Sequence, residues 1–225
     1  MIRKLFFLRQ ITRSLGVNKL LFKLIYSNKK YEQYFDDLFS SKILSNFVVY
    51  DVGANIGYYS NIYSKLVGES GKGFSFEPSI INFEKLRFNT KENTNIFPFN
   101  VAIGETETKL FLSQGEDEIG ANSRLSKSSN DKGNWIHCRT LDSFLEEIEV
   151  PNAIKIDVEG YEIEVLNGAS LLLANQKLKV IGIELHSKIL NERGINSPEK
   201  IVENILLKNG FKHKWVDFSH LVAFR

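Results

Sequence analysis

The sequence contains almost no cysteine. Cys138 is the single cysteine among 225 residues, so no disulfide can form within the chain, and a reducing cytoplasmic compartment is expected. A lone cysteine in an apolar, strand-like segment is more often a small buried hydrophobe than a catalytic thiol. Uncharged apolar runs of about 18 residues are also missing, so we expect no transmembrane helix.

Acidic residues are missing from the beginning of the chain. The first is Glu32, and eight lysines and arginines precede it (Arg3, Lys4, Arg9, Arg13, Lys19, Lys23, Lys29 and Lys30). We therefore expect a basic helical extension over residues 1–45 and a main domain over residues 46–225. The extension either packs on the main domain or rests through residues 1–30 on an anionic surface, such as the inner face of the membrane.

From residue 47 onward, strand-like and helix-like segments alternate. Apolar runs near residues 47–53, 72–78, 95–104, 152–158 and 178–186 are separated by amphipathic segments. This alternation predicts a doubly wound α/β fold with a mostly parallel sheet. Pro98 places the third strand at an edge of that sheet. The segments 211–218 and 220–225 predict a closing hairpin, and residues 104–134 predict a long loop with one short strand.

The glycine turn "DVGANIG", residues 51–57, follows the first strand, where open α/β sheets bind ligands. A dinucleotide turn requires glycine at its middle position, which is Asn55 here, and that side chain would crowd a diphosphate. An Asp51 carboxylate in the cleft would repel phosphates and attract a cation. Glu77, at the end of the second strand, can accept hydrogen bonds from ribose hydroxyls. S-adenosylmethionine carries a ribose, a positively charged sulfur and an ammonium group but no phosphate, so it fits such a cleft. The alternative is that both acids only cap helices.

The chain resembles the FkbM-type S-adenosylmethionine-dependent methyltransferases over roughly residues 46–225. The resemblance rests on "VVYDVGANIGYYS", "FSFEPS", "NVAIG", "RTLDSFL" and "IKIDVEGYEIEVLNGA" in this order. It implies a seven-stranded class I methyltransferase sheet, Rossmann-like, with an antiparallel last strand. It also implies O-methylation of sugars, polyketides or other small hydroxylated metabolites. The basic extension lies outside the resemblance.

The resemblance also implies which residues hold the cofactor. The glycine turn would contact it, Glu77 would bind the ribose, the end of the third strand would bracket the adenine, and Asp157 would lie near the methionine part. The residues concerned are Asp51, Gly53, Asn55, Gly57, Tyr58, Glu77, Asn100, Val101, Ala102 and Asp157.

A charged cluster is expected where the fourth and fifth strands end. It comprises Lys155, Asp157, Glu159, Glu184 and His186, placed on one side by the two-residue spacing. An alcohol needs a base to become a good nucleophile, and His186, with an unperturbed pKa of about 6.5, is the first choice. Glu184 and Asp157 are the alternative candidates for this base, and Lys155 would hold the carboxylates or orient the acceptor.

Two other interpretations of this cluster stay open. It can be a buried ion-pair network that only fixes the strands. It can also hold a divalent metal through Asp157, Glu159 and Glu184, whose oxygen atoms suit magnesium or calcium. The sequence supports the metal weakly, so no metal is expected.

Two rival functions remain. A nicotinamide-dependent oxidoreductase is disfavoured by Asn55, and a non-catalytic methyltransferase-like partner in a biosynthetic complex is disfavoured by the presence of Asp51, Glu77 and Asp157. Basic and aromatic residues do not interleave, so nucleic acid is not an expected partner. The acceptor, a glycan or small molecule, would be selected by residues 115–134 and by the extension.

Overall fold

The computed structural model describes residues 30–113, 125, 126 and 133–225. The chain divides into two compact units, Met1–Asp37 and Leu38–Arg225, and α3 (Lys30–Ser40) runs across the division. Most of the basic extension and of the acceptor-selecting segment lies outside the described residues, so both assignments stay predictions. No helix within the described ranges is both long and apolar enough to cross a membrane.

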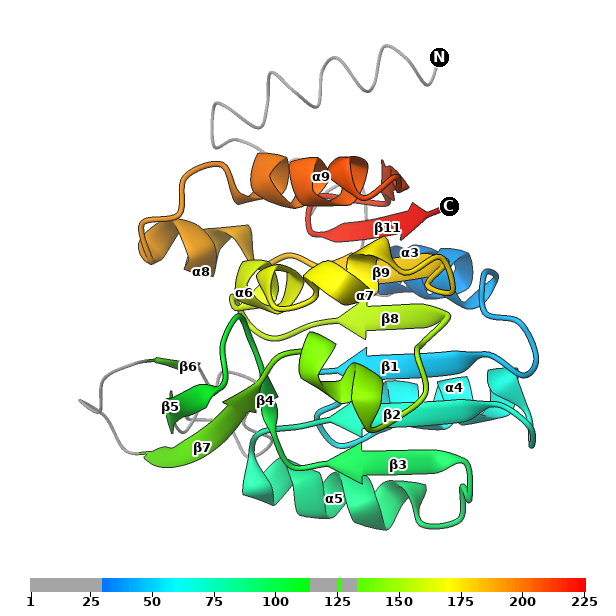
Figure 1. Cartoon of the computed structure of the whole chain (residues 1–225). Helices are drawn as coiled ribbons and strands as arrows, with labels where there is room; N and C mark the ends of the chain where they lie inside the picture. The colour runs from blue at the N-terminus through cyan, green and yellow to red at the C-terminus, as the bar shows by residue number, and fades with distance from the viewer. Residues whose placement is uncertain (1–29, 114–124, 127–132) are drawn as a thin grey trace. The chain divides into compact units, whose positions relative to one another are not determined.

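Seven strands form the main sheet in the order β10-β11-β9-β8-β1-β2-β3 (Figure 1). Strand β11 pairs antiparallel with both of its neighbours, and all other pairs are parallel. This confirms the predicted mostly parallel sheet, its antiparallel last strand, the closing hairpin and the edge position of Pro98. The strands are β1 (Val48–Val52), β2 (Lys72–Phe76), β3 (Ile96–Phe99), β8 (Ala153–Ile156), β9 (Val180–Glu184), β10 (Lys212–Trp215) and β11 (His220–Phe224).

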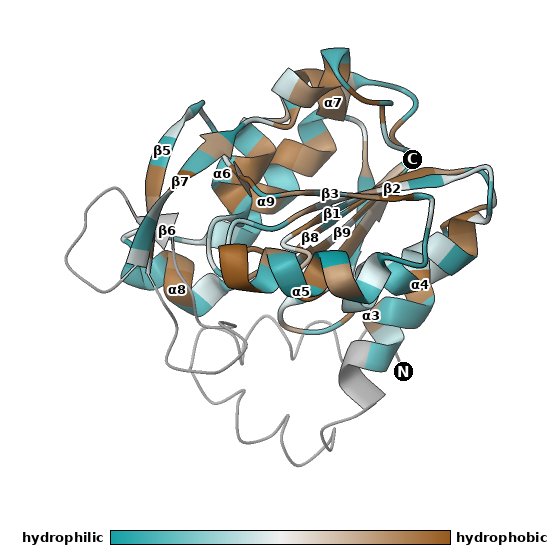
Figure 2. Cartoon of the chain, turned by 90° about the horizontal axis from the view of Figure 1, so that it is seen from below, coloured by the Kyte–Doolittle hydropathy of each residue, from teal (hydrophilic) through white to brown (hydrophobic). Residues whose placement is uncertain are grey.

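Helices cover both faces of this sheet (Figure 2). On one face lie α4 (Tyr58–Val67) and α5 (Ile80–Thr90), and on the other lie α6 (Glu162–Asn167), α7 (Ser170–Ala174) and α9 (Pro198–Lys208). The second face holds the larger apolar core, in which Tyr50, Ile154 and Ile181 are fully buried. Burial of such side chains is the main stabilising contribution to a fold of this kind.

A second sheet of four strands, in the order β4-β7-β5-β6, lies beside the carboxyl ends of the main parallel strands (Figure 1). Its strands are β4 (Ala102–Ile103), β5 (Thr108–Ser113), β6 (Leu125–Ser126) and β7 (Gly133–Arg139). The one short strand predicted within residues 104–134 is β5, which pairs along its whole length with residues 133–138 of β7. The long-loop prediction for the rest of this stretch was wrong in part, because β6 also lies in it.

The predicted third strand is also divided. The Asn100 side-chain amide donates to the carbonyl oxygens of Glu77 and Pro78 (2.9 and 3.0 Å), and the chain then leaves the main sheet so that β4 pairs with β7. After Thr140 the chain forms a 3₁₀ helix, η1 (Asp142–Glu146). The Oγ1 of Thr140 accepts from the amide of Ser143 at 3.0 Å, next to the start of this helix.

His220 anchors the hairpin to β9 from a position that is only 2% exposed. Its Nδ1 lies 3.0 Å from Asp217 Oδ2 and its Nε2 lies 3.3 Å from Glu184 Oε2. Burial alone would lower the pKa of His220, but hydrogen bonds and charges from Asp217 and Glu184 raise it to about 10. The imidazolium therefore stabilises the folded state, fully so below the unfolded pKa of about 6.5.

This stabilisation should be lost as the pH rises from about 6.5 towards 10, because the unfolded state releases its proton above about 6.5, whereas the folded state must still bind one from a solution with fewer protons. We expect His220→Gln to melt well below the wild type at pH 6.5 and the two melting curves to converge towards pH 10. Calorimetric melting across this range measures the difference. His137→Gln, at an exposed position on β7, is the control. A constant gap between His220→Gln and wild type would contradict the assignment.

Candidate functional site

A cavity opens where β1, β2, β4 and β8 end. The space between its walls is about 670 Å³, and this volume includes open solvent. Six of the predicted cofactor residues line it: Gly53, Asn55, Glu77, Val101, Ala102 and Asp157. Glu159 at its far end and Leu112 from the second sheet line it too.

The glycine turn fits closely against the end of β8. Gly53 has a φ of 83°, and a Cβ added there would lie 1.8 Å from the carbonyl oxygen of Asp157. The amides of Gly53 and Ala54 both donate to the carbonyl oxygen of Phe76 at 3.0 Å. Glycine is therefore required by the close approach of two backbones as well as by the left-handed conformation.

Glu77 is held rigidly at one wall of the cavity, with 6% of its surface exposed. Its Oε2 accepts from the amide of Asn55 at 2.9 Å and its Oε1 from the amide of Ser79 at 2.8 Å. Burial raises the pKa of Glu77 to about 7. Each carboxylate oxygen can accept a further hydrogen bond, so the group is placed to receive two hydroxyl donors.

Asn55 provides an unused acceptor in the same cavity. It adopts a left-handed φ of 51°, and its side-chain Oδ1 is buried without a hydrogen-bond partner. A buried acceptor of this kind costs free energy unless a ligand supplies a donor. The donors of S-adenosylmethionine, namely its ribose hydroxyls and its amino groups, therefore fit the residues present.

Asp51 does not line the cavity, contrary to the sequence-based interpretation. Its side chain points to the opposite face of β1, where Oδ2 accepts from Ser60 Oγ at 2.7 Å and 2% of the residue is exposed. Burial raises its pKa. Gly57, Tyr58 and Asn100 are also not among the described residues that line the cavity. Direct contact of these four with a cofactor stays a prediction.

Lys155 is buried beside Asp51, which is its register partner across β1 and β8. Its Nζ donates to Asp157 Oδ2 at 3.0 Å and lies 4.5 Å from the centre of the Tyr59 ring. Burial opposes the charge, but the carboxylates of Asp157 and Asp51 raise the pKa of Lys155. The ammonium thus holds the Asp157 carboxylate at the cavity wall, as the sequence suggested.

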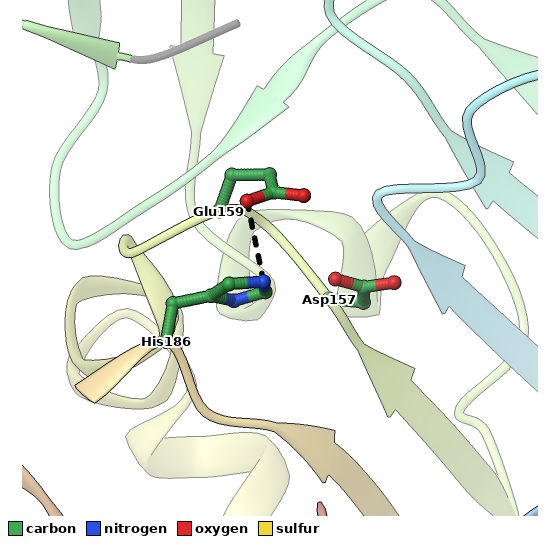
Figure 3. Close-up of side chains that lie close together, drawn as sticks. All are labelled: Asp157, Glu159 and His186. Atoms are coloured by element: carbon green, nitrogen blue, oxygen red, sulfur yellow. Dashed lines mark ion pairs between the residues drawn. The ribbon is translucent and has the colours of Figure 1, made fainter. Parts of the chain in front are cut away.

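The structure separates Glu184 from His186. Glu184 pairs with His220, whereas His186 lies between Glu159 and Glu162, with Nε2 3.2 Å from Glu159 Oε2 and Nδ1 2.8 Å from Glu162 Oε1. Figure 3 shows that Asp157, Glu159 and His186 point toward one another. We call these three residues the carboxylate–histidine group.

The pKa values in this group differ from those assumed from the sequence. Burial would lower the pKa of His186, but the carboxylates of Glu162 and Glu159 raise it to about 9, so the ring is cationic at neutral pH rather than an available base. Burial raises the pKa of Glu159 to about 7, although His186 acts in the opposite direction. Burial would also raise the pKa of Glu184, but His220 lowers it.

Glu162 is the residue that sequence reasoning missed, and Glu159 was given no catalytic role there. Glu162 is completely buried, and its Oε1 also accepts from the amide of Gly160 at 2.8 Å. Glu159 and Gly160 both have positive φ, 52° and 91°, which turns the chain back so that Glu162 reaches His186. The signal in the sequence was "VEGYE", where two acids flank a glycine at a strand end.

Comparisons with known proteins agree with this geometry. The family model described as the methyltransferase FkbM domain matches residues 51–213. The hexuronic acid methyltransferase AglP of Haloferax volcanii is 30% identical over 145 residues, which cover 63% of this chain and 57% of that protein.

Solved structures resemble the chain in fold. The methyltransferase FkbM from Methylobacillus flagellatus aligns with a TM-score of 0.55 and 20% identity, over 87% of this chain and 49% of that chain. Fibrillarin from Aeropyrum pernix, with natively bound S-adenosyl-L-methionine, aligns with a TM-score of 0.53 and 13% identity, over 86% of this chain and 73% of that chain.

The fold is that of the class I methyltransferases, as predicted. The chain spans about half the length of AglP and of the Methylobacillus protein. Because the FkbM domain model covers most of the chain, from the glycine turn to β10, the chain belongs to the FkbM methyltransferase family.

Proposed function

We propose that this protein is an S-adenosylmethionine-dependent O-methyltransferase acting on a hydroxyl of a sugar, a glycan or a small metabolite. The observation that carries the proposal is the cavity after β1 and β2, where Glu77 is fixed by two backbone amides and Asn55 Oδ1 has no partner. The family match supports methyl transfer. Similarity to a hexuronic acid methyltransferase makes uronic-acid glycans the first acceptors to test.

Each wall of the cavity has a distinct task. Glu77 binds the ribose hydroxyls, Asn55 accepts from a polar hydrogen of the ligand, and Val101 and Ala102 bracket the adenine. When bound, S-adenosylmethionine supplies a methyl group on a positively charged sulfur. The carboxylate of Asp157 favours this positive charge, and no lysine or arginine is among the described lining residues to favour phosphate.

The carboxylate–histidine group receives the acceptor. Glu159 lines the cavity and its side chain is 35% exposed, whereas His186 is 19% exposed and sits between two carboxylates. Glu159 is therefore the better-placed base: its carboxylate would take the acceptor's hydroxyl proton, while the methyl carbon would exchange its bond to sulfur for a bond to the acceptor oxygen and leave S-adenosylhomocysteine. His186 holds that carboxylate from behind, and orientation of the acceptor supplies much of the remaining acceleration.

The two rival functions differ in what they bind. A nicotinamide-dependent oxidoreductase requires space for a diphosphate at Asn55, and a non-catalytic partner requires no ligand. Thermal melting with S-adenosylhomocysteine and with NAD distinguishes them, because only a bound ligand raises the melting temperature. We expect a rise with S-adenosylhomocysteine alone. A rise with NAD alone, or with neither compound, would refute the proposal.

Glu77→Gln should weaken S-adenosylhomocysteine binding at least about tenfold. The variant replaces a carboxylate oxygen, which accepts from backbone and ribose, by an amide that donates. Titration calorimetry measures the affinity, and melting without ligand checks the fold. Glu92→Gln, at a side chain 88% exposed, is the matched control. Unchanged affinity in Glu77→Gln would remove Glu77 from the ribose site.

The acceptor is identified by mass spectrometry. The protein is incubated with S-adenosylmethionine and either uronic-acid oligosaccharides or neutral oligosaccharides of the same length. A methyl-sized mass increase that is stable to mild alkali indicates an ether at a hydroxyl, whereas an alkali-labile increase indicates an ester at the carboxylate and contradicts O-methylation of a hydroxyl. An increase on the neutral oligosaccharides alone would exclude uronic acids.

A further inference from the structure

We propose that the carboxylate–histidine group, Asp157, Glu159 and His186, is a binding site for a divalent transition-metal ion of the Mn²⁺ type. The site lies at the end of the cavity beyond β8, next to the place of the methyl acceptor. Metal binding by these side chains does not depend on the proposed function, and it is tested with the metal alone.

The three side chains offer one ligand atom each, and these atoms all lie within 4.8 Å of one another. Bonds of about 2.0–2.2 Å to a common ion place neighbouring ligands about 3 Å apart and opposite ligands about 4.3 Å apart. The Nε2 of His186 and Oε2 of Glu159 are 3.2 Å apart, which matches neighbouring ligands. Figure 3 shows the three side chains close together, and the widest separation allowed by the 4.8 Å limit exceeds that of opposite ligands by about 0.5 Å.

The imidazole is oriented as in metal centres. Histidine ligands usually donate their second ring N–H to a carboxylate, which fixes the tautomer and the ring plane. Here Nδ1 lies 2.8 Å from Glu162 Oε1, and the fully buried Glu162 is itself fixed by the Gly160 amide. With Nδ1 keeping its proton, a metal ion would displace the proton on Nε2, which lies 3.2 Å from Glu159 Oε2.

The backbone also presents the ligands. The left-handed turn at Glu159 and Gly160 directs the Glu159 carboxylate back over His186, and a Cβ at Gly160 would come within 2.4 Å of Ile189. Lys155 fixes Asp157 through Oδ2. The buried carboxylates of Asp51 and Glu162 offset the ammonium of Lys155, so the surroundings still favour a cation.

The donor set selects the kind of ion. The earlier alternative used Glu184 and suited magnesium or calcium, but Glu184 is occupied by His220. An imidazole nitrogen together with two carboxylates suits Mn²⁺ and its neighbours in the first transition series better than an all-oxygen ion.

All three ligands are only partly exposed, and two of them, Asp157 and Glu159, line the cavity. Coordination positions therefore remain for water or substrate.

The role of the ion rests on the proposed function. An acceptor with a carboxylate beside a hydroxyl, or with two adjacent hydroxyls, could chelate the ion, and a coordinated hydroxyl loses its proton more readily. In that state Glu159 would be a ligand, and the proton of the coordinated hydroxyl would pass to solvent water instead of to Glu159.

The test titrates Mn²⁺ into the chelator-treated full chain, followed by electron paramagnetic resonance of free Mn²⁺ and by calorimetry. We expect one saturable equivalent per chain that an equal concentration of Mg²⁺ does not displace. Glu159→Gln and His186→Gln should weaken binding at least about tenfold, and Glu162→Gln about 10–100-fold through the imidazole. Glu192→Gln removes the same charge from an exposed side chain on α8 (Ser187–Glu192) and should bind like the wild type.

Three results would overturn the proposal: no saturable binding, binding unchanged in Glu159→Gln and His186→Gln, or loss in Glu184→Gln with His186→Gln unaffected. Melting with S-adenosylhomocysteine in the same samples separates the two proposals. A protein that binds S-adenosylhomocysteine but no Mn²⁺ lacks the metal site and keeps the proposed function. A protein that binds Mn²⁺ but no S-adenosylhomocysteine has the metal site and lacks the proposed function.

Discussion

Glu159→Gln should lower kcat by about 10²–10⁴-fold, the range typical of a lost general base. The amide keeps the size of the side chain but cannot take a proton from the acceptor, and it binds a metal ion poorly. Glu159 is not among the residues expected to hold the cofactor, so the affinity for S-adenosylhomocysteine should change less than about threefold.

Single-turnover methyl transfer, with cofactor affinity measured on the same preparation, checks this prediction. His186→Ala should also lower turnover more than cofactor affinity, because Glu159 loses the cation that orients it. Glu192→Gln is the control for the change of charge. If Glu159→Gln turns over normally while His186→Ala does not, the base is His186, as the sequence first suggested.

Gly53→Ala should be the most destabilising single-methyl change in the cavity. The added Cβ would overlap the carbonyl oxygen of Asp157 at 1.8 Å, so either the turn or the end of β8 must move. Backbone displacement together with the left-handed conformation should cost at least about 3–4 kcal/mol. For a domain of this size that lowers the melting temperature by roughly 10 °C.

Gly194→Ala provides the matched control. Gly194 has nearly the same φ, 84°, but a Cβ there meets nothing within 4 Å. The Gly194→Ala variant should lose only about 1–2 kcal/mol of its free energy of unfolding, which is the cost of the left-handed conformation for alanine. Calorimetric melting of both variants isolates the steric part. Equal losses would mean that the turn does not pack against β8 as described.

The sheet could be predicted because its signals are local. The alternation of apolar and amphipathic segments predicted the parallel strands. Pro98 predicted that β3 lies at an edge of the main sheet, and the short connection before β11 predicted the hairpin of β10 and β11. The second sheet was missed because its strands β5 and β7 pair across a polar, glycine-containing stretch whose composition is that of a loop. Pairing between distant segments is not visible in composition.

The site could be predicted only in part, for reasons of geometry. Alternation along β1 shows that Asp51 and Val52 face opposite sides, but not which side carries the cavity. Glu184 and His186 would share a side if β9 continued, but the strand ends at Glu184 and His186 is the N-cap residue of α8. The chain therefore turns between them, and each finds a different partner.

The left-handed backbone at Glu159 has a consequence for how this protein can change. A side chain other than glycine in that conformation costs on the order of 1–2 kcal/mol, and Glu159 adds a half-buried negative charge beside Asp157 and Glu162. Glu159, which we propose as the base, is thus a residue whose replacement by glycine would make the fold more stable. Selection for heat resistance alone would tend to erode turnover at this position, a trade-off built into a single turn of the chain.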